Sequence, residues 1–228
     1  MMGKSLDDIS VCVFDAYGTL FDFESGIRHV RDKLGDKADA LSRLWREKQL
    51  QYTWLRSQMG LHQDFWHVTG DALDFAMGAL DMADPAIRAE LMQLYLQLKA
   101  YPEVADTLTR LKQANMRTAI LSNGSPTMLA AVVNSAGLHE FIDTVLSVEE
   151  VGIFKPHPSV YQLVPDRMAV KPENVCFLSA NGWDVHGAAS FGFKVLWINR
   201  AGAPRERLPG EPVGEIVSLA ELPEWLGL

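Results

Sequence analysis

The chain has 228 residues, of which 48% are hydrophobic and 22% are charged, and its formal net charge is −8. These values are ordinary for a soluble globular protein, and the length suits one large domain or a core domain with a smaller insert. The acidic balance excludes the basic face that nucleic acid and anionic membranes require, so we expect neither as a partner.

The sequence also bears on where the protein resides. Its amino terminus lacks the apolar core of a signal peptide, and no stretch is long and apolar enough to span a bilayer. The two cysteines, Cys12 and Cys176, both fall in predicted buried strands, where free thiols of a reducing compartment are the simplest interpretation. We therefore expect a cytoplasmic protein.

The first predicted element is a strand over residues 11–14. Its four residues, Val-Cys-Val-Phe, are all apolar and are followed by a turn signal, which is typical of a strand buried on both faces. Asp15 comes directly after them, and open α/β sheets place their ligand crevice at the carboxyl ends of strands. Removing a carboxylate from water is costly unless it has a partner. We therefore expect Asp15 either to cap a turn or to take part in catalysis.

A helical block follows, from about residue 22 to about residue 100. Apolar residues recur at helical spacing in three stripes, and no strand pattern interrupts them. The stripes contain Leu41, Leu44, Trp45, Tyr52 and Leu55, then Leu73, Ala76, Met77 and Leu80, then Ile87, Leu91, Leu94, Tyr95 and Leu98. We expect a helical domain inserted directly after the first strand.

Strands and helices alternate in the rest of the chain. Strands are predicted over 118–121, 144–146, 175–178 and 194–198, which favours a parallel sheet with right-handed crossovers. Pro165 is expected to limit the helix that opens at Pro156 and Pro158, and Ser218 with Glu221 forms a capping box for a last short helix. The predicted fold class is α/β: a Rossmann-like, doubly wound parallel sheet of residues 1–21 and 101–228, with a helical cap of residues 22–100 inserted.

Polar clusters follow three of the predicted strands, and Lys155 lies on the loop after a fourth. The clusters are Asp15 to Thr19, Ser122 with Asn123, and Ser179 to Asp184. Because the carboxyl ends of parallel strands meet at one edge of a sheet, we expect the four groups to converge there. Such a convergence is far more specific than any one motif.

These residues resemble the motifs of the haloacid dehalogenase superfamily. The matching segments are Asp15-Ala16-Tyr17-Gly18-Thr19-Leu20, Ser122-Asn123-Gly124, Lys155-Pro156 and the segment that ends at Asp184. The likeness runs from about residue 11 to residue 199. It is strongest to the L-2-haloacid dehalogenases, because residues 44–56 resemble their cap and Ser179-Ala180-Asn181-Gly182-Trp183-Asp184 resembles their fourth motif.

Two positions depart from the phosphatases of the same superfamily. Those enzymes carry an aspartate two positions after the nucleophile to protonate the leaving alcohol, and here that position is Tyr17. They carry another aspartate, a Mg²⁺ ligand, where this chain has Ala180. A halide leaves as a stable anion and needs neither group. The resemblance therefore implies hydrolysis of short L-2-haloalkanoic acids to D-2-hydroxy acids, without metal or organic cofactor.

The resemblance also implies roles for the catalytic residues. Asp15 would attack the α-carbon of the acid in an SN2 displacement and form an ester, which water then hydrolyses. Lys155 would pair with Asp15 and keep it ionised, while Thr19 and Ser179 would hold its carboxylate in one rotamer. Asn181 and Asp184 would position the hydrolytic water.

His186 is an alternative base for that water. A neutral imidazole can take a proton near pH 7, and Glu24 could orient the ring. A surface histidine near a helix start is the alternative interpretation. The sequence leaves open whether Asn181, Asp184 or His186 activates the water.

A second set of residues is implied to bind the substrate and the halide ion. Ser122, with backbone N–H groups near Ala16 and Tyr17, would hold the substrate carboxylate. The halide would lie between Arg46, Asn123 and the edge of Trp183. The apolar wall around the alkyl chain would be formed by Tyr17, Leu50, Phe65 and Trp183, and Tyr161 would hydrogen-bond near Lys155.

Other interpretations remain open for several of these residues and for the whole chain. Arg46 could be a solvated helix arginine, and the aromatic side chains could be core between the cap and the sheet. The whole chain could instead be a Mg²⁺-dependent phosphatase for a small phosphate ester, or a catalytically silent binding protein. The resemblance further suggests a homodimer built largely through the cap, whose apolar stripes exceed what one small core needs.

Overall fold

The computed structural model describes residues 6–228, apart from the side chains of residues 24–27 and 29. Within this part of the chain, six parallel strands form one sheet in the order β3-β2-β1-β4-β5-β6. Their bounds are β1 (Val11–Phe14), β2 (Arg117–Ser122), β3 (Thr144–Ser147), β4 (Val175–Ser179), β5 (Lys194–Ile198) and β6 (Gly214–Ile216). The predicted fold class is confirmed, and β6 is the one strand that the sequence pattern did not indicate.

β1 lies in the middle of the sheet and pairs with both β2 and β4. From β1 the chain winds outward to one edge through β2 and β3, and later to the other edge through β4, β5 and β6. The four residues of β1 are completely buried, as expected for an apolar strand covered on both faces. The strand order therefore reverses beside β1, which is where sheets of this kind open a crevice.

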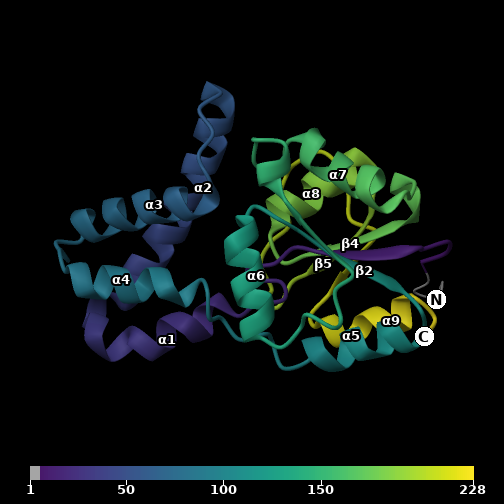
Figure 1. Cartoon of the computed structure of the whole chain (residues 1–228), viewed down its shortest axis with the longest axis horizontal. Coiled ribbons are helices and arrows are strands. Elements are labelled where there is room, and N and C mark those ends of the chain that lie inside the picture. The colour runs from purple at the N-terminus through teal and green to yellow at the C-terminus, as the bar shows by residue number, and fades with distance from the viewer. Residues whose placement is uncertain (1–5) are drawn as a thin grey trace.

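Helices cover both faces of the sheet. In Figure 1, α7 (Pro158–Met168) and α8 (Gly182–Phe191) lie above the strands, and α5 (Val104–Gln113) and α9 (Leu222–Trp225) lie below them. The remaining core helix is α6 (Pro126–Ser135), which is capped by the Ser125 side chain and ends two residues before Gly137. The capping box of Ser218 and Glu221 is present at the turn that precedes α9.

The expectation that Pro165 limits α7 is wrong, because the helix continues past it to Met168. A proline removes one backbone hydrogen bond but does not by itself end a helix whose apolar face is buried. Five residues of α7 are buried on both sides of the proline: Val160, Tyr161, Leu163, Val164 and Met168. Packing on the core outweighs the local penalty here.

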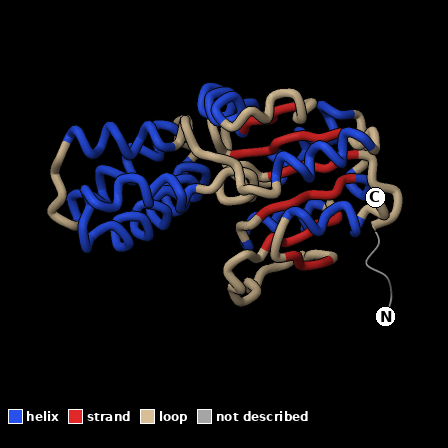
Figure 2. The backbone as a smooth tube through the Cα atoms, turned by 90° about the horizontal axis from the view of Figure 1, so that it is seen from below, coloured by secondary structure: helices blue, strands red, loops and turns tan. Residues whose placement is uncertain are grey.

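Residues 22–100, which we call the cap, contain four α-helices among the described residues. They are α1 (Phe23–Leu34), α2 (Ala38–Met59), α3 (Phe65–Ala79) and α4 (Pro85–Leu94). Asp64 and Asp84 cap α3 and α4 with their carboxylates. The third apolar stripe extends beyond its helix, since Tyr95 and Leu98 are buried after α4 has ended. Figures 1 and 2 show these helices as a lobe set apart from the sheet, opposite the two ends of the chain.

Two segments connect the cap to the core, and they run side by side. Phe21 forms an antiparallel bridge with Ala100, Asp22 N donates to Lys99 O at 2.8 Å, and Tyr101 N donates to Leu20 O at 3.0 Å. The cap therefore leaves and re-enters the core at one place, directly after the turn that follows β1. No helix in the described part of the chain is long and apolar enough to cross a membrane.

Gly187 allows α8 to pack closely on α7. A Cβ atom at this position would lie 2.5 Å from the Tyr161 hydroxyl and 2.7 Å from Pro156 Cβ. We expect Gly187→Ala to lower the free energy of unfolding by about 1–3 kcal/mol, because such overlap forces side chains or backbone to shift. Urea unfolding followed by circular dichroism measures this value.

Gly78→Ala is the matched control, because Gly78 lies in α3 and a Cβ there meets no atom within 4 Å. In that helix the change should raise stability by about 0.5–1 kcal/mol. Equal stability of Gly187→Ala and the unchanged protein would contradict the packing described for α7 and α8.

Candidate active site

Asp15 lies at the carboxyl end of β1 and accepts hydrogen bonds on both carboxylate oxygens. Oδ1 accepts from Lys155 Nζ at 3.2 Å, and Oδ2 accepts from Asn181 Nδ2 at 2.9 Å and from Thr19 Oγ1 at 3.2 Å. Its own N–H donates to Leu178 O in the neighbouring strand. Backbone and side chain are thus both fixed, and Oδ1 has the more available lone pair of the two oxygens.

Lys155 places one ammonium group between two carboxylates. Its Nζ lies 3.2 Å from Asp15 Oδ1 and 2.9 Å from Asp184 Oδ2, and the residue is only 1% exposed. Burial alone would lower the pKa of Lys155, but the charges of Asp184 and Asp15, and their hydrogen bonds, outweigh it and raise this pKa above its ordinary value. The side chain is therefore a fixed positive charge at neutral pH.

Asp184 holds the other side of Lys155. It is completely buried at the start of α8, and its second oxygen, Oδ1, accepts a hydrogen bond from Tyr161 Oη at 2.8 Å. A buried carboxylate needs partners for all of its charge, and here both oxygens have one. Tyr161 thus acts on Lys155 through Asp184, in the region where the sequence analysis expected it.

Two hydroxyl groups fix the backbone that follows β4. Thr19 Oγ1 donates to Asp15 and accepts from Ala180 N at 2.9 Å. Ser179 Oγ accepts from Asn181 N at 3.1 Å and so fixes the residue that binds Asp15 Oδ2. Thr19 therefore contacts Asp15 directly, whereas Ser179 acts through Asn181.

Ser122 is the last residue of β2, which lies next to β1, Asn123 follows it, and both are buried. Asn123 Oδ1 accepts from Lys155 N at 3.0 Å, and Ser122 Oγ accepts from Gly124 N at 3.1 Å. Both residues thus shape backbone at this edge of the sheet. None of the described hydrogen bonds joins either of them to Asp15.

The cap covers this edge with aromatic side chains. The Tyr17 ring lies 5.3 Å from that of Tyr95 and 6.1 Å from that of Phe65, and its hydroxyl is buried with no partner among the described residues. Arg46 contacts the same cluster from α2: its guanidinium lies 5.3 Å from the centre of the Phe23 ring and interacts with Tyr95, and its Nη1 donates to Gln49 Oε1 at 3.3 Å. None of the described contacts of Arg46 reaches Asn123, so the structure does not bring together these two residues, which were expected to bind the halide ion.

Leu50 is half-buried on α2, whereas Phe65 is buried at the start of α3. Trp183 is also half-buried and meets Trp54 of α2 edge-to-face, with the ring centres 5.7 Å apart. Both indole N–H groups are buried without a partner among the described residues. Sequence reasoning missed Trp54, because a tryptophan on an amphipathic helix carries no signal that separates a site from core.

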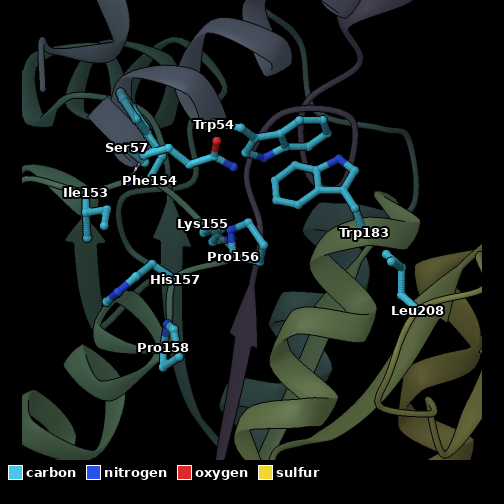
Figure 3. A pocket seen from close by; sticks show the side chains of 11 residues that line it. Trp54, Ser57, Ile153, Phe154, Lys155, Pro156, His157, Pro158, Trp183 and Leu208 are labelled. Atoms are coloured by element: carbon cyan, nitrogen blue, oxygen red, sulfur yellow. Dashed lines mark hydrogen bonds between the residues drawn. The ribbon is translucent and has the colours of Figure 1, made fainter. Parts of the chain in front are cut away.

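A cavity of about 660 Å³ opens beside Lys155, between the end of α2 and the start of α8. Figure 3 shows Trp54 and Trp183 side by side in the wall of this cavity, with Lys155 and Pro156 below them. The walls are mainly apolar, with Ser57, Gln58 and His157 as further polar members. Its size and composition are typical of small-molecule sites.

His186 lines an adjoining cavity of about 400 Å³, which shares Pro156, Pro158, Trp183 and Leu208 with the cavity beside Lys155. It is 4% exposed, and its Nδ1 has no partner among the described residues. Residues two apart on a helix point in different directions, so His186 faces away from the side on which Asp184 meets Lys155. The structure does not bring it to Asp15, and the side chain of Glu24 lies outside the described residues.

Two polar contacts that the sequence gave no reason to expect join the cap to the core near Lys155. His62 Nε2 lies 3.0 Å from Glu149 Oε2, and the His62 ring lies 4.8 Å from that of Phe154. Ser57 Oγ accepts from Phe154 N at 3.2 Å. The residue before Lys155 is thus held by the cap from two directions.

The described residues contain no group of three or more His, Cys, Asp or Glu side chains that could hold a metal ion. Ala180 donates its N–H to Thr19 and has no side-chain ligand to offer. The absence of a cofactor remains a prediction of the sequence.

Comparison with known proteins supplies the family. A model of haloacid dehalogenase-like hydrolases matches residues 9–192. (S)-2-haloacid dehalogenase 1 of Pseudomonas sp. (strain CBS-3) is 44% identical over 225 residues, which cover 97% of this chain and 98% of that protein.

Solved structures agree with the sequence match. A dehalogenase with an intermediate complex superposes with a TM-score of 0.95 at 42% identity, over 97% of this chain and 99% of that one. L-2-haloacid dehalogenase from Xanthobacter autotrophicus with chloropropionic acid covalently bound has a TM-score of 0.87 at 38% identity, over 94% and 97% of the two chains. The sheet, the cap and the matched residues together establish that the chain belongs to the haloacid dehalogenase-like hydrolases.

Proposed function

We propose that this protein is a hydrolase of carbon–halide bonds that converts short-chain L-2-haloalkanoic acids to D-2-hydroxy acids. Relatives that match nearly the whole chain are (S)-2-haloacid dehalogenases, and one similar solved structure holds chloropropionic acid covalently. The substrate is a small carboxylic acid, the products are a hydroxy acid and a halide ion, and Asp15 is the nucleophile.

The observation that carries the proposal is Tyr17, which stands beside a fixed carboxylate nucleophile where a phosphatase has an acid. Burial, and then Tyr95 and Asp15, raise the pKa of Tyr17 far above that of an ordinary phenol. Such a group is a poor proton donor to a leaving alcohol at neutral pH. A departing halide needs no proton, so this site suits a carbon–halide bond better than a phosphate ester.

In the first step, Asp15 Oδ1 attacks the α-carbon, a C–O bond forms, and the C–halogen bond breaks with its electron pair leaving on the halide. Lys155 and Asn181 fix the attacking carboxylate, which lowers the entropic part of the barrier. Attack from the face opposite the halide inverts the α-carbon.

In the second step, water attacks the Asp15 carbonyl carbon of the ester, and the bond from that carbon to the alkylated oxygen breaks. This regenerates the Asp15 carboxylate and releases the D-2-hydroxy acid and one proton. We assign the positioning of this water to Asn181 and Asp184, because Asn181 donates to Asp15 at 2.9 Å and Asp184 joins the same network through Lys155. His186 has no contact of this kind.

Substrate recognition follows from the residues around Asp15. We assign the substrate carboxylate to Ser122 and the backbone N–H groups of Ala16 and Tyr17, and the halide to Arg46, Asn123 and Trp183. The alkyl chain then faces Tyr17, Leu50, Phe65 and Trp183. Arg46 would have to turn from its contact with Phe23, which a closing cap or the incoming anion would favour.

We also propose a cytoplasmic homodimer built through the cap. Large apolar side chains are exposed at the end of α2 and on α3, with Leu55 44%, Met59 65% and Phe75 44% exposed. Leu55 and Met59 lie four residues apart and so share one face of α2, and neighbouring exposed apolar side chains are typical of a protein interface. Cys12 and Cys176, which pair in register in β1 and β4, are free thiols in this arrangement, as suits a reducing compartment.

We expect the unchanged protein to release halide from L-2-chloropropionate in the presence of EDTA, and to give D-lactate in chiral chromatography. Asp15→Asn should lower this rate by at least about 10⁴-fold, because an amide oxygen is a far weaker nucleophile. Circular dichroism checks that the variant is folded. Metal-dependent phosphate release without halide release would instead identify a phosphatase.

The second step can be tested by trapping the ester. Asn181→Ala should accumulate a covalent adduct on Asp15, detected by intact-protein mass spectrometry after acid quench, because the group that positions the water is lost. His186→Gln should turn over without accumulation, since none of the described hydrogen bonds joins its ring to Asp15, Lys155 or Asn181. The opposite pattern would make His186 the base, and accumulation in neither variant would contradict the placement of the water.

The dimer is tested by light scattering at micromolar concentration. Leu55→Asp combined with Met59→Asp should halve the mass, because charges are costly to bury in an apolar interface. Val217→Asp, at a residue 66% exposed on the core, should leave the mass unchanged. A monomeric mass for the unchanged protein would rule out the dimer.

A further inference from the structure

Arg200, two residues after the end of β5, donates to the backbone of the turn that follows the nucleophile. Its Nη2 lies 3.2 Å from Thr19 O and its Nη1 lies 3.4 Å from Gly18 O. The N–H groups of this turn are directed inward, where those of Thr19, Leu20 and Phe21 share the carbonyl oxygen of Ala16. Gly18 has a φ of +83°, so a side chain there would be strained.

The same guanidinium is held from two other sides. Nη2 also donates to Glu103 Oε1 at 2.8 Å, and Cζ lies 3.9 Å from the centre of the Tyr101 ring. Burial would raise the pKa of Glu103, but its hydrogen bond from Arg200 and further local interactions lower it below the ordinary value, so this carboxylate is charged at neutral pH. Arg200 thus connects β5, the nucleophile turn and the segment through which the cap returns to the core.

We infer that Arg200 is a positioning residue for Asp15, acting through Thr19. The guanidinium fixes the Thr19 backbone, and Thr19 Oγ1 contacts Asp15 Oδ2 at 3.2 Å while accepting from Ala180 N. A shift of this turn moves the nucleophile relative to Lys155 and Asn181. This role rests on the proposed function and assigns to that reaction a residue that does not contact the substrate.

The role requires an arginine. The planar guanidinium offers several N–H groups in one fixed plane, so it can reach three acceptors while its face stacks on Tyr101. A lysine keeps the charge, but all of its N–H groups are on one nitrogen and it has no planar group that could stack on Tyr101. The charge and the geometry can therefore be separated by substitution.

We expect Arg200→Lys to lower kcat by about tenfold to a hundredfold, with KM changed by less than about threefold, because a displaced nucleophile slows the chemistry more than it weakens substrate binding. Arg205→Met is the matched control. Arg205 lies on the same loop, is 57% exposed and forms only a 3.7 Å ion pair with Glu215 among the described contacts. Unchanged kcat in Arg200→Lys would overturn the inference.

A double-mutant cycle with Thr19→Val separates positioning from a general loss of stability. If Arg200 acts through Thr19, kcat of the variant with both changes should lie within about twofold of kcat of Thr19→Val, because the contact that Arg200 supports is already absent. Losses in kcat that multiply would show that the two residues act independently, and would overturn the inference.

Hydrogen–deuterium exchange gives a measurement that does not depend on the reaction. The amides of residues 18–21 should exchange at least about tenfold faster in Arg200→Lys than in the unchanged protein, and at the unchanged rate in Arg205→Met. Equal exchange in Arg200→Lys would overturn the inference. If no halide is released by the unchanged protein, the proposed function fails, and the exchange experiment still decides whether Arg200 fixes the turn.

Discussion

One buried ammonium between two carboxylates is the constraint on which the site depends. Taking these charges out of water is costly, and the cost is offset only when every charged atom has a partner at short distance. Lys155 reaches both Asp15 and Asp184, so removing Lys155 would leave two buried carboxylates without a counter-charge. The end of β1, the loop at Lys155 and the start of α8 must therefore keep one mutual arrangement, which Thr19, Asn181 and Tyr161 complete.

Much of this arrangement could be read from the sequence because it follows from the order of elements. Apolar runs that end in polar residues predicted parallel strands whose carboxyl ends meet, and that rule alone brings Asp15, Lys155 and Asp184 to one edge. The sheet, the helical nature of the cap and the capping box at Ser218 have the same local origin. Each depends on residues close together in the chain, where periodicity and capping act.

The rest depends on contacts between segments that are distant in sequence, and no local pattern reports these. The His62–Glu149 and Ser57–Phe154 contacts require the cap to fold back on the core. The direction of His186 depends on its angular position on α8, and α7 continues past Pro165 because its buried face outweighs one missing hydrogen bond. A three-residue strand such as β6 has too few residues for a periodic signal.

The position of β1 has a consequence for how the protein is made. Val11 pairs with Arg117 and Val175, so the whole cap is synthesised before the strand that carries the nucleophile has any neighbour. Cap helices rely on local contacts and can form early on the ribosome, whereas β1 exposes an apolar edge until β2 emerges. Asn181 and Asp184 follow β4, so the active site assembles only near the end of translation. A product truncated before β4 would therefore retain the nucleophile and Lys155 but lack the groups that hold Lys155 from its other side and position water.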